Sequence, residues 1–69
     1  MQRKKINSAK IRSAGYDARS QTLDIEFSNG DVYAYSGVSP EVHRRLMNAP
    51  SPGSFFDDRI AEEYSSRRV

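Results

Sequence analysis

The chain has 69 residues, which leaves room for one small domain. It contains no cysteine, so a disulfide framework and a thiolate metal site are both excluded, and a reducing compartment is favoured. Eleven Lys and Arg residues face nine Asp and Glu residues, which gives a formal net charge of +2. Because no apolar run is long enough to cross a bilayer, we expect a cytoplasmic domain without membrane contact. We also expect either a monomer or a weak homo-oligomer.

Basic residues are concentrated near both ends of the chain. Residues 1–5 are predicted to be a disordered basic tail and residues 65–69 a second tail, because such charge runs are usually only solvated. The predicted domain lies between them, over residues 6–64. Its first strand is expected over about residues 8–16, where apolar and polar residues alternate weakly with a period of two.

The strongest structural signal is a hairpin around Asn29-Gly30. Residues 23–27 alternate strictly between apolar and acidic side chains, which predicts a half-buried strand. Residues 31–35 contain valine and two tyrosines, which suit a partner strand. Asn-Gly between two such runs is typical of a tight hairpin turn.

The register of this hairpin decides where Tyr33 and Tyr35 point. With a two-residue loop at Asn29-Gly30, both tyrosines lie on the outer face beside the acidic residues of the preceding strand. With a three-residue loop that begins at Ser28, Ile25 faces Tyr33 and both tyrosines are core, because a one-residue slip exchanges the two faces. We favour the second register, since a small domain needs the buried aromatic area.

Two helices are predicted after the hairpin. Ser39 is a good N-cap, Pro40 fits the first helical position, and Pro50 ends the first helix. Ser54 is expected to cap the second helix, with Asp57 completing an arrangement like a capping box. Strands followed by helices predict an α+β fold with a small three-stranded antiparallel sheet, followed by two short helices packed on one face.

Basic and aromatic residues are the candidates for nucleic-acid binding. Arg44 and Arg45 on the first helix and Arg59 on the second could form one basic patch, unless they pair with neighbouring glutamates. Tyr33 and Tyr35 could stack bases in the register that exposes them. The full candidate set is Lys10, Arg12, Tyr33, Tyr35, Arg44, Arg45 and Arg59.

Other kinds of site have weaker support. Gly53 and Ser54 are candidate anion-binding residues, because backbone N–H groups at a helix start bind anions, although Asp57 already lies at that end. His43, the only histidine, is predicted on the polar face of the first helix without a nucleophile or an orienting carboxylate. We therefore predict no catalytic residue, no metal site and no cofactor.

The order and spacing of these residues resemble the KTSC domain, a short module also found at the C-terminus of some lysyl-tRNA synthetases and as small bacterial and phage proteins. The resemblance runs over about residues 6–64 and rests on Ser8, Ile11, Gly15-Tyr16-Asp17, residues 23–27, Gly30, Tyr33-Ala34-Tyr35, Gly37-Val38, Pro40, Ala49, Ser51, Gly53, Phe55-Phe56, Ile60 and Tyr64. Through the association with a tRNA synthetase it implies an RNA-binding role. Pro52 and Ala61 stand where the family often has basic residues, and Asp57 where it often has Asn.

These observations predict a non-catalytic binding domain, with RNA as the favoured partner. Binding should then weaken with salt and with loss of the three helix arginines. One alternative is a protein-interaction module, for example a bacterial or phage protein that docks on a host factor through a sheet edge or an apolar patch. Another is a small-ligand or nucleotide binder that uses the loop at residues 51–54.

Overall fold

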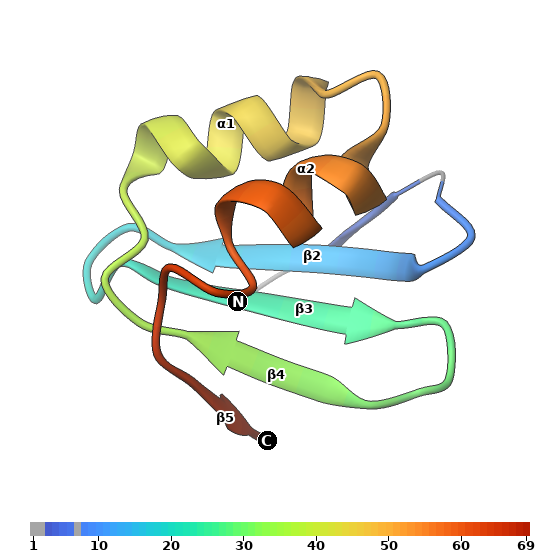
Figure 1. Cartoon of the computed structure of the whole chain (residues 1–69). Helices are drawn as coiled ribbons and strands as arrows, with labels where there is room; N and C mark the ends of the chain where they lie inside the picture. Colours follow the sequence, from blue (N-terminus) through green and yellow to red (C-terminus); the bar gives the residue numbers. More distant parts are fainter. Residues whose placement is uncertain (1–2, 7) are drawn as a thin grey trace.

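In this computed structural model, which describes residues 3–6 and 8–69, the chain forms a five-stranded antiparallel sheet with two helices packed on one face (Figure 1). The strands lie in the sheet in their chain order, so the chain returns after the helices to pair beside the last strand of the hairpin. In chain order the elements are β1 (Arg3–Lys5), β2 (Ile11–Asp17), β3 (Thr22–Phe27), β4 (Val32–Tyr35), α1 (Pro40–Asn48), α2 (Pro52–Arg59) and β5 (Ser66–Arg68).

The α+β class is confirmed, but the predicted three-stranded sheet is wrong, because a short strand is added at each edge. β1 lies within the predicted tail 1–5 and pairs with β2, and β5 lies within the predicted tail 65–69 and pairs with β4. Residues 1 and 2 of the first tail lie outside the described residues. Both added strands are mostly Lys and Arg, so no apolar alternation marks them, and only backbone pairing with an existing edge makes them strands.

The β3–β4 hairpin has the register that turns both tyrosines toward the helices. Ile25 pairs with Tyr33, and Tyr35 is only 5% exposed. The Gly30 N–H donates to the carbonyl of Phe27 at 2.9 Å, and Gly30 has a φ of +97°. A side chain would make that left-handed conformation unfavourable. The favoured three-residue loop is therefore confirmed.

The core lies between the helix-facing side of the sheet and the two helices. Phe56 of α2 makes edge-to-face contacts with Tyr35 and Phe27, both with ring centroids 5.4 Å apart. The neighbouring Phe55 is only half-buried. The buried cluster consists of Ile6, Ile11, Ala14, Leu23, Ile25, Tyr35, Val38, Leu46, Phe56 and Ile60.

The first helix has the predicted ends, and the second begins earlier than predicted. Ser39 caps α1 by accepting the N–H of Val42 at 3.4 Å. In α2 the N-cap is Ser51 and not Ser54, because Pro52 supplies the first helical φ and the helix continues through the following glycine. Asp57 consequently lies near the end of α2, where it forms an ion pair with the side chain of Lys10 and caps nothing.

A stacked ring pair holds α1 against the end of β2. The rings of Tyr16 and His43 have centroids 4.7 Å apart at an interplanar angle of 9°, and the Tyr16 hydroxyl donates to the carbonyl of Val38 at 2.5 Å. His43 was predicted on the polar face of the first helix, but it is half-buried and its ring stacks on Tyr16. Burial of the imidazole lowers the pKa of His43, and the charge of Lys4 acts in the same direction.

No helix in the described part of the chain is long and apolar enough to cross a membrane.

Replacing Phe56 by alanine should cost about 3–5 kcal/mol of unfolding free energy, because it empties the centre of the core. A domain of this length has a total stability on the order of 5 kcal/mol, so the variant should be largely unfolded by circular dichroism. Phe55→Ala is the matched control and should cost only about 1 kcal/mol, because part of its ring is already in solvent. Equal losses for the two variants would contradict the packing described above.

The lowered pKa of His43 should make the folded state less stable in mild acid. Below the ordinary histidine pKa of about 6.5 the unfolded chain takes up a proton that the folded chain resists, so the unfolding free energy falls until the folded pKa is passed. His43→Phe keeps a ring against Tyr16 but cannot titrate. Urea unfolding at about pH 7 and about pH 5 should show a smaller drop for this variant than for the wild type. Equal drops would show that burial does not perturb His43.

Candidate functional site

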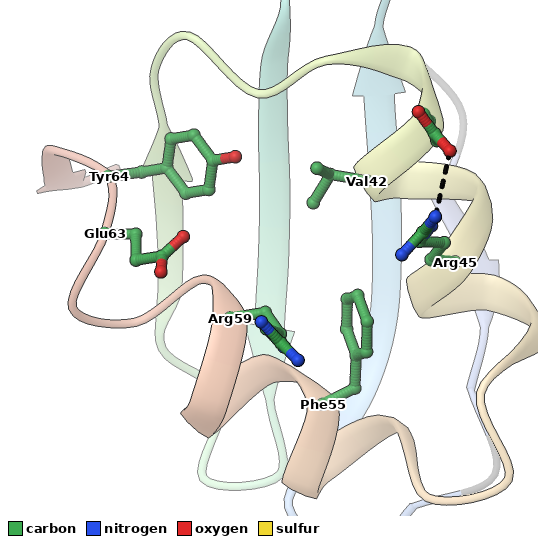
Figure 2. A pocket seen from close by; sticks show the side chains of 7 residues that line it. Val42, Arg45, Phe55, Arg59, Glu63 and Tyr64 are labelled. Carbon is green, nitrogen blue, oxygen red and sulfur yellow. Dashed lines mark hydrogen bonds and ion pairs between the residues drawn. The ribbon is translucent and has the colours of Figure 1, made fainter.

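A hollow lies between α1, α2 and the turn that follows α2 (Figure 2). Its volume is about 330 Å³. We call it the helix hollow, and it is lined by Glu41, Val42, Arg45, Phe55, Arg59, Glu63 and Tyr64.

Each helix contributes one apolar residue and one arginine to the helix hollow. Val42 and Arg45 are three residues apart on α1, and Phe55 and Arg59 are four apart on α2, so each pair lies on one helix face. Tyr64 comes from the turn after α2, where its N–H donates to the carbonyl of the fully buried Ile60 at 3.3 Å. The backbone of the turn is therefore fixed to the core, which places residues 63 and 64 beside the hollow.

The floor of the helix hollow is apolar and partly aromatic. Val42, Phe55 and Tyr64 pack against the core but are only partly buried, so part of each side chain meets solvent. In Figure 2 the Phe55 ring and the Tyr64 hydroxyl point into the hollow. The exposed part of such a ring can stack on a planar aromatic ligand.

The charged side chains of the helix hollow differ in whether they already have an ion-pair partner. Arg45 donates to the carboxylate of Glu41 at 3.1 Å, along the exposed surface of α1. The side chains of Arg59 and Glu63 are exposed, and among the described residues they make neither an ion pair nor a hydrogen bond. Their charges are therefore available to a ligand.

Of the three predicted helix arginines, the structure brings two together. Arg45 and Arg59 line the same hollow from opposite helices. Arg44 lies beside Pro40 and Glu41 on a separate part of α1, with its guanidinium 3.9 Å from the Glu41 carboxylate. The single patch predicted from the sequence is therefore reduced to a pair.

Lys10 and Arg12 do not join this pair. The Lys10 ammonium is engaged with Asp57, and Arg12 donates to the carbonyl of Ser28 at 3.2 Å and lies 3.8 Å from the Glu26 carboxylate. Both cations therefore have local partners away from the helix hollow.

Tyr33 and Tyr35 do not form an exposed stacking platform. Tyr35 is buried, and Tyr33 is half-buried with its ring 5.8 Å from the ring of Phe27, in an edge-to-face contact. Phe55 and Tyr64, which the sequence analysis did not select, are also half-buried, but both line the helix hollow together with arginines. One signal was available: two adjacent aromatic residues on a helix cannot both face the core, so one of the pair 55–56 must point elsewhere.

Gly53 and Ser54 lie at a second hollow, of about 430 Å³, between the start of α2 and residues 8–10. The chain packs closely here, because a β-carbon on Gly53 would lie 3.1 Å from the Ser8 hydroxyl oxygen. Lys10 and Asp57 both line this hollow and pair with each other. That pairing neutralises the lysine that an anion would need.

Within the described residues, no cluster of His, Asp and Glu side chains could hold a metal ion.

Comparison with known proteins places the chain in a family. It is 44% identical over 57 residues to an uncharacterized protein of Stutzerimonas stutzeri, covering 83% of this chain and 80% of that protein. It is 40% identical over 59 residues to a lysine–tRNA ligase of Nostoc punctiforme, covering 86% of this chain but only 10% of the ligase. The crystal structure of a KTSC domain protein from Yersinia pestis is similar, with a TM-score of 0.93, 38% identity, and coverage of 99% of this chain and 96% of that one.

The matched region includes every residue that lines the helix hollow. The model of the KTSC domain family matches residues 7–64, which run from just before β2 to the turn after α2. This chain therefore belongs to the KTSC domain family.

Proposed function

We propose that this KTSC domain is a non-catalytic module that binds single-stranded RNA in the helix hollow. The observation that carries the proposal is that two partly exposed rings, Phe55 and Tyr64, line the same hollow as one arginine from each helix. Proteins that bind single strands combine aromatic side chains that stack on bases with positive charge that follows the phosphates.

The size and charge of the helix hollow limit how RNA would be held. Its volume of about 330 Å³ is at the small end of the range of ligand sites, which suits one nucleotide. Two arginines and two glutamates line it, so their formal charges cancel and stacking supplies most of the binding. With one or two phosphates contacted, the logarithm of the binding constant should fall with the logarithm of salt with a shallow slope of about −0.7 to −1.4.

The related proteins favour RNA as the ligand. Lysine–tRNA ligases of Nostoc punctiforme and Trichormus variabilis contain a segment 40–44% identical to this chain, which makes up 10% of each ligase. A tRNA ligase has an RNA substrate, so a binding segment attached to it is well placed to contact RNA. The same reasoning favours a cytoplasmic location for this domain.

The sheet edges give less support to the alternative of a protein partner. β1 and β5 are three residues long and mostly basic. Short, charged edge strands discourage the addition of a further strand. The helix hollow is therefore the better candidate for the binding surface.

Fluorescence anisotropy with a labelled single-stranded oligoribonucleotide of mixed sequence at low salt tests the proposal. Phe55→Leu keeps the apolar contact but removes the ring, and it should weaken binding about 5- to 100-fold, the value of one stacked base. Arg59→Gln should also weaken binding and should reduce the salt slope by about 0.7.

The matched control for Arg59→Gln is Arg19→Gln, which removes the same charge from the exposed turn between β2 and β3. Only the backbone N–H of Arg19 makes a hydrogen bond there, to Asp17, so the substitution leaves that turn intact. The control should bind like the wild type. The proposal fails if the wild-type domain does not bind at low salt, or if the two arginine variants are indistinguishable.

A further inference from the structure

We infer that the helix hollow selects an unpaired guanine over the other bases, an inference that rests on the RNA-binding function proposed above. The residue that points to this choice is Glu63. A carboxylate is unexpected in an RNA site, because it repels the phosphates. It is useful in such a site where it reads hydrogen-bond donors on a base edge.

The backbone of Glu63 is held in place, while its carboxylate is available to a ligand. Its backbone N–H donates to the carbonyl of the fully buried Ile60 at 3.2 Å, which fixes the turn that carries it. Its carboxylate is exposed and, among the described residues, has no hydrogen bond and no ion pair, even with Arg59 in the same wall. Figure 2 places Glu63 beside Tyr64, at the edge of the helix hollow formed by the turn after α2.

An ionised carboxylate accepts hydrogen bonds through both oxygens and donates none. On the Watson–Crick edge guanine presents two adjacent donors, N1–H and the N2 amino group, which match the two oxygens. Adenine presents one donor beside an acceptor, cytosine one donor beside acceptors, and uracil one donor between two acceptors. Facing a carboxylate, each of these bases leaves an acceptor opposed to negative charge, so guanine is favoured.

Arginine completes the match. Guanine carries two acceptors, O6 and N7, on the edge next to its donor pair, and arginine is the side chain that most often contacts them. The helix hollow supplies an acceptor from Glu63 and an unpaired donor group from Arg59, and either Phe55 or Tyr64 can stack on the ring. Among the four bases, only guanine offers adjacent donors to the glutamate and adjacent acceptors to an arginine.

The test compares short oligouridylates whose central base is guanine, adenine, cytosine, inosine or uracil, with the full chain at low salt. The guanine oligonucleotide should bind at least about fivefold more tightly than the adenine one, the lower limit for a bidentate base contact. Inosine, which lacks the N2 amino group, should lose most of that advantage. Glu63→Gln should remove the guanine preference without weakening binding of the adenine oligonucleotide.

Glu62→Gln is the matched control, because it removes the same charge from the neighbouring exposed residue that does not line the helix hollow. It should keep the guanine preference. Equal affinity for all central bases, or a guanine preference that survives Glu63→Gln, would overturn the inference while leaving RNA binding in place. If no oligonucleotide binds, the proposed function itself fails.

Discussion

The register of the β3–β4 hairpin determines which face of the sheet the helices must cover. The left-handed Gly30 closes a three-residue connection, and the ladder then directs Leu23, Ile25 and Tyr35 to the same side. That side is too apolar to remain in water, because each such side chain contributes about 1.5–3 kcal/mol when buried. Both helices pack on it (Figure 1), and the position of every residue in the helix hollow follows from that packing.

The helix hollow exists because α2 can bury only one of its two adjacent phenylalanines. Phe56 takes the central position against Tyr35 and Phe27. Consecutive residues on a helix point about 100° apart, so Phe55 is turned toward the space beside α1. There it lines the helix hollow together with Val42 and Tyr64 and stays partly exposed. The aromatic surface proposed for RNA binding is thus a by-product of how the core is filled.

Local signals explain which parts of the fold are predictable from the sequence. The Asn29-Gly30 turn and the Ser39-Pro40 helix start depend on neighbouring residues only, and both are found as expected. The strands β1 and β5 carry no local signal, because their residues are charged and pair only once an edge is present. For α2, the serine at 54 looked like a cap, while Pro52 had already started the helix.

The candidate site was harder to predict than the fold. Arg45 and Arg59 stand out by their charge, and they line one hollow because the two helices that carry them pack together. Phe55, Glu63 and Tyr64 were missed as a group, because their positions depend on which phenylalanine is buried and on how the turn after α2 is tied to Ile60. Both depend on tertiary packing, which the spacing of residues along the chain does not reveal.

The short strand β5 also protects the strand beside it. β4 consists of Val32, Tyr33, Ala34 and Tyr35, a run of β-forming residues without charge or proline, which is the composition that promotes intermolecular strand pairing when an edge is bare. β5 covers that edge, held by the bond from the Val69 N–H to the Val32 carbonyl and by an ion pair between Arg68 and Asp31. A cover of three residues opens more readily than the core of the sheet. Self-association of this domain should therefore begin by fraying of its last strand, well before global unfolding.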